Sequence, residues 1–194
     1  MRRMLSLPAC VIWCAVTMLP AAAFGQYGAT DGEWRTYAGD QGSTKYSPLD
    51  QIDATNFNEL QIAWRWQSAD GTLDLDALRD QRIGISIRGL QATPLMVDGT
   101  LYLSTAMYQA AAIDAGTGDT VWVYDPQVYL RGQPTHGYGS RGVAYWTDGE
   151  DERIFWGTSE GYLLGVDART GQPAAGFGDN GRVDLTEGIP RATR

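Results

Sequence analysis

The sequence predicts an all-β protein assembled from small sheets of four short strands. Short apolar runs alternate with turn residues, and Gly supplies 24 of the 194 residues. A turn sequence at 113–118 recurs at 166–171, which is a shift of 53 residues. Repeats of this length with several short strands each are typical of β-propeller blades or of a β-solenoid, because one small sheet needs neighbours to bury its faces. The number and spacing of the strands favour the propeller.

The first repeat spans residues 91–124. Asp98-Gly99 lies between two apolar runs, and this dipeptide favours the two-residue hairpin turn with positive φ at both positions. Its strands are expected at 95–97, 101–103, 110–113 and 121–124.

The second repeat begins at Arg141. Its strands are expected at 142–146, 153–157 and 162–166, with an acidic turn at 147–152. Residues 177–185 look like a turn into one more strand. A chain of this length holds about two to three blades with long loops between them.

The residues between the N-terminal leader and the first repeat are less regular. Residues 34–46 are Gly-rich and aromatic, which predicts an ordered loop with at most a short strand. Asp53 or Thr55 is suited to cap one helical turn that ends near Leu60.

Two further segments precede the first repeat. Residues 61–67 alternate between apolar and polar, which predicts a strand with one face formed by Ile62, Trp64 and Trp66. Residues 68–88 are too long for a hairpin turn, so we expect an insertion that lies over one end of the sheet.

Residues 1–25 have the features of a secretory signal peptide. Arg2 and Arg3 form a basic start, an apolar run follows at 5–19, and Ala21-Ala22-Ala23 offers small residues for cleavage. We therefore expect 1–25 to be removed and 26–194 to form propeller blades in the periplasm or outside the cell.

Cysteine content and charge restrict the function further. Cys10 and Cys14 both lie in the expected leader, so residues 26–194 contain no disulfide and no thiolate metal site. The formal charge is −8, and it becomes −10 without Arg2 and Arg3. This acidic balance argues against nucleic acid or anionic lipid as a partner.

The repeated turn has a physical role of its own. In the sequence Ala112-x-Asp114-x-x-Thr117-Gly118-x-x-x-Trp122, the Asp and Thr side chains can accept backbone N–H bonds, and Gly can adopt positive φ. The motif resembles the tryptophan-docking motif of the pyrroloquinoline-quinone (PQQ) dehydrogenases, which are eight-bladed propellers. The second copy has Gly165 in place of the Ala and Ala175 in place of the Trp, so docking there is expected to be weaker or built differently.

Other segments resemble the same family in the same order. They are 34–52, 58–64, 91–99, the strand 141–146, and 177–185, which is similar to the sugar and polyol branch of the family. The resemblance implies an incomplete eight-bladed propeller, with PQQ and Ca²⁺ as cofactors.

Three residues are implied at the cofactor. Arg141 is the main candidate, since a guanidinium makes planar, charge-assisted bonds to carboxylates such as those of PQQ. Gln91 stands where relatives often carry a Glu near the cofactor, and His136 lies upstream of the arginine. The alternatives are a surface salt bridge for Arg141 and a solvent-facing loop position for His136.

No residue of this chain is expected to hold a metal or to act as the catalytic base. The resemblance implies that the calcium ligands and the catalytic aspartate come from later blades. The acidic stretch 148–151 lacks the alternating spacing of a calcium loop and is interpreted as a solvated turn. Trp64 and Trp122 are interpreted as docking residues of the core.

Two functions are compatible with these patterns. The first is the N-terminal part of an exported PQQ-dependent dehydrogenase that oxidises a sugar, polyol or alcohol and passes electrons to a quinone or cytochrome. The second is a non-catalytic propeller scaffold for protein assembly in the cell envelope, which would need the docking motif but not Arg141.

Overall fold

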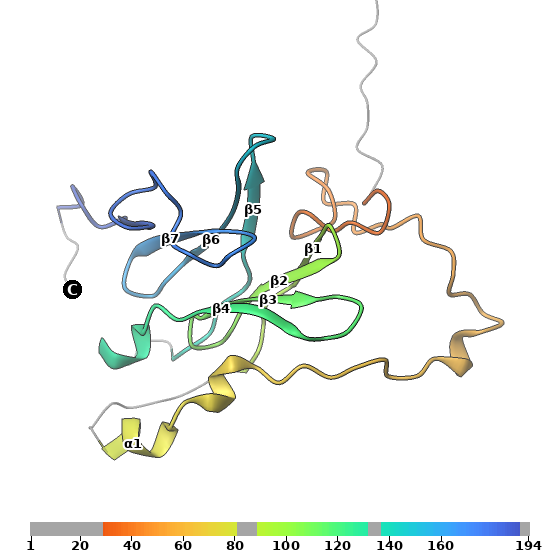
Figure 1. The fold of residues 1–194 in the computed structure, drawn as a ribbon, viewed down its shortest axis with the longest axis horizontal. Coiled ribbons are helices and arrows are strands. Elements are labelled where there is room, and N and C mark those ends of the chain that lie inside the picture. Colours follow the sequence, from red (N-terminus) through yellow and green to blue (C-terminus); the bar gives the residue numbers. More distant parts are fainter. Residues whose placement is uncertain (1–28, 81–88, 132–136, 191–194) are drawn as a thin grey trace, which may run out of the picture.

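The structure, a computed structural model, describes residues 29–80, 89–131 and 137–190. It contains two four-stranded antiparallel sheets whose strands follow chain order (Figure 1). The first sheet consists of β1 (Leu95–Val97), β2 (Thr100–Ser104), β3 (Ala110–Asp114) and β4 (Thr120–Tyr124). The second consists of β5 (Ala144–Thr147), β6 (Glu152–Gly157), β7 (Tyr162–Asp167) and β8 (Arg182–Asp184). The prediction of blade-like sheets is confirmed.

The turn between β1 and β2 has the predicted form. Asp98 and Gly99 have φ values of 46° and 77°, as a two-residue turn with positive φ at both positions requires. The turn fixes the register, in which Leu95 pairs with Tyr102 and Val97 with Thr100.

One apolar core joins the two sheets. Every other residue of β1 is buried, and the same face of the sheet carries the buried residues Tyr102, Ala110, Ala112 and Trp122 of β2 to β4. The core contains Leu95, Val97, Tyr102, Ala110, Ala112, Trp122, Ile154, Trp156, Leu164, Val166 and Ala168. Because these residues come from both sheets, each sheet buries the apolar face of the other.

Trp122 attaches the first sheet to the second. Its indole Nε1 donates to the carbonyl oxygen of Ala168 at 2.8 Å, and its ring lies against Gly171. A Cβ at Gly171 would lie 2.7 Å from the ring, and the backbone there has a φ of +68°. Only Gly satisfies both conditions without strain.

Trp64 makes the same contact with the first sheet. Its Nε1 donates to the carbonyl oxygen of Ala115 at 3.0 Å, and its ring lies against Gly118, where a Cβ would be 2.7 Å away. Ala115 and Gly118 are the residues that correspond to Ala168 and Gly171 in the repeat. The interpretation of Trp64 and Trp122 as docking residues is confirmed.

The strand predicted at 61–67 does not form. The segment forms no ladder within the described residues, and Ile62 is 64% exposed. Alternation can make a segment extended, but a strand also needs a hydrogen-bonding neighbour. The segment is held by its tryptophans instead, since Trp66 Nε1 donates to Thr120 Oγ1 at 2.9 Å.

The second sheet lacks a tryptophan at the repeat position, and Phe177 lies there in its place. The Phe177 ring packs edge-on against Phe155, with centroids 4.9 Å apart, where Trp122 packs on Tyr102 in the first sheet. A Cβ at Gly165 would lie 2.6 Å from Phe155 and 2.8 Å from Phe177. The aromatic pair therefore explains why Gly165 replaces the alanine, and the expectation of a differently built contact is confirmed.

The fourth strand of the second sheet is interrupted. Pro173 forms an isolated bridge with Val166, and the regular pairing resumes only where Arg182 faces Leu164. The predicted strand in 177–185 is therefore β8, and a loop separates it from the turn that precedes it.

The described part of the 68–88 insertion covers one end of the first sheet, as predicted. It forms a 3₁₀ turn (Ala69–Thr72) and α1 (Leu75–Asp80), and another 3₁₀ turn (Val128–Arg131) follows β4. Figure 1 shows α1 beyond the end of β4. These elements share a second apolar cluster formed by Leu78, Met107, Tyr108, Val128, Tyr129 and Tyr138, with Leu73 and Leu75 packed against it.

Asp70 connects the insertion to the loop between β2 and β3. Its carboxylate accepts from Thr105 Oγ1 at 2.6 Å and from the Met107 backbone N–H at 3.2 Å. Burial raises the pKa of Asp70 above its usual range, although these hydrogen bonds oppose the shift.

The remaining segments agree with the predictions. Trp34 forms a single bridge to Met96, and one 3₁₀ turn (Phe57–Glu59) follows Asp53, whose carboxylate accepts from the Thr55 N–H at 2.6 Å. Asp148 accepts from the backbone N–H groups of Glu150 and Asp151 in an exposed turn. Within the described residues, no helix is long and apolar enough to span a membrane.

We predict that Gly171→Ala destabilises the chain more than Gly99→Ala. Both positions have positive φ, so each substitution costs about 1–2 kcal/mol of backbone strain. At Gly99 nothing lies within 4 Å, whereas at Gly171 the new methyl group meets the Trp122 ring. The clash adds about 1–3 kcal/mol. Urea denaturation of the two variants measures the difference, and equal losses in unfolding free energy would show that the tryptophan contact is not tight.

We predict that Asp70→Asn and Asp148→Asn change the pH dependence of stability in opposite directions. Because the pKa of Asp70 is raised in the folded chain, the stability that this shift contributes is complete below the pKa of Asp70 in the unfolded chain. That stability is lost as pH rises through the pKa of Asp70 in the folded chain. Backbone N–H bonds from Asp151 and Glu150 lower the pKa of Asp148, so its contribution is lost as pH falls. Between about pH 3 and 7, the unfolding free energy of the unsubstituted chain minus that of the variant should fall for Asp70→Asn and rise for Asp148→Asn. Thermal unfolding of the unsubstituted chain and of both variants across this pH range tests the two directions. If the two differences in unfolding free energy change with pH in the same direction, the prediction is wrong.

Candidate functional site

The segments that carry Gln91 and Arg141 lie side by side. The Thr93 N–H donates to the Arg141 carbonyl oxygen at 3.3 Å, and Thr93 forms a parallel bridge with Gly142. These segments lead into β1 and β5, which are the first strands of the two sheets. The two repeats thus bring the two candidate residues to the same end of neighbouring sheets.

Gly142 allows this close approach. Its φ is +138°, and a Cβ there would lie 3.2 Å from the Thr93 carbonyl oxygen. A larger residue after Arg141 would push the two segments apart.

The Arg141 guanidinium is available to an external ligand. Arg141 is exposed, and within the described residues it forms no ion pair and no side-chain hydrogen bond. Gln91 is exposed as well. A guanidinium in this state can bind a planar carboxylate with two parallel hydrogen bonds, and a nearby amide can add a neutral one.

A buried pair of hydroxyls holds the backbone just before Arg141. Ser104 Oγ at the end of β2 and Ser140 Oγ are 2.7 Å apart, and both serines are buried. This contact, together with the Asp70 bonds to the neighbouring loop, was not predicted from the sequence. The available signal was a run of small polar residues, Ser104 and Thr105, directly after an apolar strand.

Two parts of the sequence interpretation concern residues that the structure does not describe. His136 and the expected leader at 1–25 lie outside the described residues. Among the residues that the structure describes, no group of three or more His, Cys, Asp or Glu side chains is placed to hold a metal ion.

Comparisons with known proteins all indicate the same family. A family profile described as glucose/ethanol/alcohol dehydrogenase, β-propeller domain, matches residues 34–194. The dehydrogenase subunit of the quinone-type alcohol dehydrogenase of Gluconacetobacter polyoxogenes is 36% identical over 174 residues, covering 84% of this chain and 21% of that protein. The cytochrome c-type 1-butanol dehydrogenase of Thauera butanivorans is 36% identical over 146 residues, covering 74% of this chain and 18% of that protein.

A solved structure supports the same assignment. The quinohemoprotein alcohol dehydrogenase of Comamonas testosteroni matches with a TM-score of 0.58 and 31% identity, covering 80% of this chain and 20% of that protein. The chain thus spans about a fifth of the length of these relatives. The two sheets match part of their propeller, and the chain belongs to the β-propeller family of the PQQ dehydrogenases.

Proposed function

We propose that this chain is the N-terminal part of an exported PQQ-dependent dehydrogenase that oxidises a sugar, polyol or alcohol. The observation that carries the proposal is the exposed Arg141 guanidinium, which has no partner within the described residues and lies on a segment paired with that of Gln91. The family membership supports the oxidation of alcohol groups, since the profile and the relatives are described as glucose and alcohol dehydrogenases.

The residues present fit one side of the cofactor. PQQ, when bound, supplies the quinone that accepts the electrons of the substrate. Arg141 would hold carboxylate groups of PQQ, and Gln91 would donate a hydrogen bond to an oxygen of the same molecule. The Ser104–Ser140 contact would keep the Arg141 backbone in place while its side chain binds. His136 remains a third candidate.

The calcium ion and the catalytic aspartate are assigned to other blades of the propeller. The electron acceptor is proposed to be a quinone or a cytochrome, as the names of the two relatives indicate for those proteins. The signal peptide expected at 1–25 is the reason for proposing export to the periplasm or the cell exterior. A propeller scaffold in the cell envelope would give no role to Arg141.

We predict that Arg141→Gln weakens PQQ binding by about 10-fold or more, because a hydrogen bond to a charged group contributes about 1.5–3 kcal/mol. Titration of the chain with PQQ and calcium, followed by tryptophan fluorescence, measures the affinity. Arg169→Gln is the matched control, since Arg169 lies in the turn that follows β7, where it bonds the Glu150 carbonyl oxygen. Equal affinity in the unsubstituted chain and Arg141→Gln would remove Arg141 from the site and favour the scaffold.

We predict that purified residues 26–194 show no PQQ-dependent oxidation of alcohols or sugars. The reason is that only one side of the cofactor site is assigned to this chain. Reduction of an artificial dye in the presence of PQQ and calcium is the assay, with the Comamonas testosteroni enzyme as the positive control. Turnover above the rate of free PQQ would contradict the division of the site between blades.

A further inference from the structure

The backbone of Tyr108 is strained. Its φ is 64°, in the left-handed region that glycine occupies easily and that a bulky side chain rarely adopts. Tyr108 lies in the loop between β2 and β3, where its N–H donates to the Thr105 carbonyl oxygen at 3.2 Å and closes a tight turn. A glycine would form this turn without strain, so the tyrosine is expected to supply something that glycine cannot.

The Tyr108 side chain contacts the segment that leads to Arg141. Its ring packs edge-on against the ring of Tyr138, with 6.3 Å between the centroids and 64° between the planes. Both tyrosines are buried, and Tyr138 lies shortly before Arg141 in the sequence. Because edge-on aromatic pairs favour one relative orientation of the two rings, the contact restricts where the Tyr138 side chain can lie.

The loop that carries Tyr108 is itself held on two sides. On the side of the insertion, the Asp70 carboxylate accepts from Thr105 Oγ1 at 2.6 Å and from the Met107 N–H at 3.2 Å. On the side of the second sheet, Trp156 Nε1 donates to the Tyr108 carbonyl oxygen at 2.9 Å. Tyr108 therefore offers Tyr138 a fixed surface to pack against.

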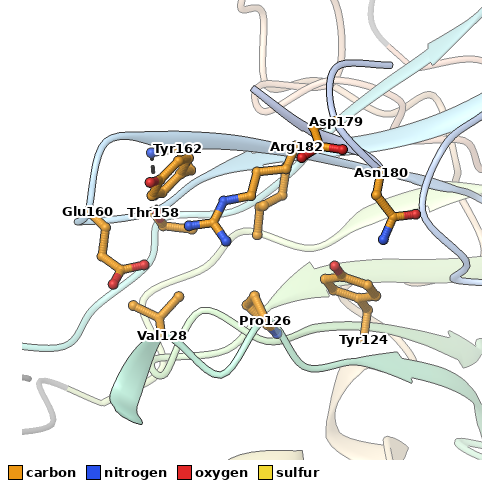
Figure 2. Close-up of a pocket in the computed structure, with 10 residues that line it drawn as sticks. Tyr124, Pro126, Val128, Thr158, Glu160, Tyr162, Asp179, Asn180 and Arg182 are labelled. Carbon is orange, nitrogen blue, oxygen red and sulfur yellow. Dashed lines mark hydrogen bonds between the residues drawn. The ribbon is translucent and has the colours of Figure 1, made fainter. Parts of the chain in front are cut away.

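Trp156 is fixed in turn by a residue of the first sheet. It is buried, and its ring packs edge-on against the ring of Tyr124, with 5.7 Å between the centroids. Figure 2 shows the Tyr124 side chain extending from β4 toward the second sheet, at the edge of the cavity that it lines. The hydrogen bond to the Tyr108 carbonyl thus comes from a ring that both sheets hold in place.

Two buried contacts hold alternate residues of the segment before Arg141. Tyr108 packs against Tyr138, and Ser104 Oγ lies 2.7 Å from Ser140 Oγ. Tyr138 and Ser140 are buried, whereas Arg141 is exposed. An exposed side chain can present its charged group in one direction only if the backbone that carries it is held by packing and hydrogen bonds.

We propose that Tyr108 is a positioning residue for Arg141 in the proposed PQQ site. Its left-handed backbone places an aromatic ring against Tyr138. Together with the Ser104–Ser140 contact, this ring fixes the direction in which the Arg141 side chain leaves the backbone. The inference rests on the proposed function, because it gives the position of Arg141 a purpose.

The first test is the PQQ affinity of Tyr108 variants, measured by tryptophan fluorescence in a titration with PQQ and calcium. Tyr108→Gly removes the ring and also the backbone strain, so the turn can still form. We expect it to weaken PQQ binding by about 5-fold or more, because the aromatic pair that orients the Arg141 segment is lost. Tyr108→Phe retains the ring and should bind PQQ as tightly as the unsubstituted chain.

A double-mutant cycle with Arg141→Gln separates positioning from a general effect on stability. If Tyr108 acts through Arg141, Tyr108→Gly causes no further loss of affinity in the Arg141→Gln chain. Equal losses in both backgrounds would overturn the proposal. Leu78→Ala is the control, since it removes a side chain from the same apolar cluster at α1 and should leave the affinity unchanged. A loss as large as that of Tyr108→Gly would show a general softening of the cluster and reject the role of Tyr108.

A measurement without PQQ completes the test. Backbone ¹⁵N relaxation should show residues 138–141 as rigid as β5 in the unsubstituted chain and in Tyr108→Phe, and more mobile in Tyr108→Gly. Mobile residues 138–141 in the unsubstituted chain would overturn the proposal, whatever the folding of the variants. A loss of PQQ affinity in Arg141→Gln but not in Tyr108→Gly rejects only the role of Tyr108, whereas unchanged affinity in Arg141→Gln rejects the proposed cofactor site as well.

Discussion

The contact between a tryptophan ring and a left-handed glycine determines how the sheets are arranged. Trp64 on Gly118 and Trp122 on Gly171 use the same geometry, in which the indole N–H bonds a backbone carbonyl three residues before the glycine. The ring can lie flat on the turn only because no Cβ projects from it. The core that the two sheets share lies between units held at this spacing.

The sequence was sufficient to predict the features that depend on local chemistry. The Asp98-Gly99 turn, the two repeats and the four-stranded sheets follow from residues within a few positions of one another. The strand predicted at 61–67 failed because a ladder needs a neighbour, which local alternation does not reveal. The role of Phe177 could not be predicted either. The loop after Pro173 breaks the alignment of the two repeats, and only the packing of Phe177 on Phe155 shows that Phe177 takes the place of the tryptophan.

The residues of the candidate site also divide into those that the sequence predicts and those that it does not. Arg141 and Gln91 were proposed from their motifs, and the bond between Thr93 and Arg141 shows that their segments meet. The Ser104–Ser140 pair could not be predicted, because the serines are far apart in the sequence and neither belongs to a recognisable motif.

Each docking contact has its two halves in different repeats: the tryptophan precedes the turn that receives it. A duplicated repeat therefore carries a receiving glycine for the unit before it and a tryptophan for the unit after it, so copies can be added in tandem without new adaptation. The second sheet departs from this rule, since Ala175 cannot reach forward and Phe177 folds back onto its own sheet.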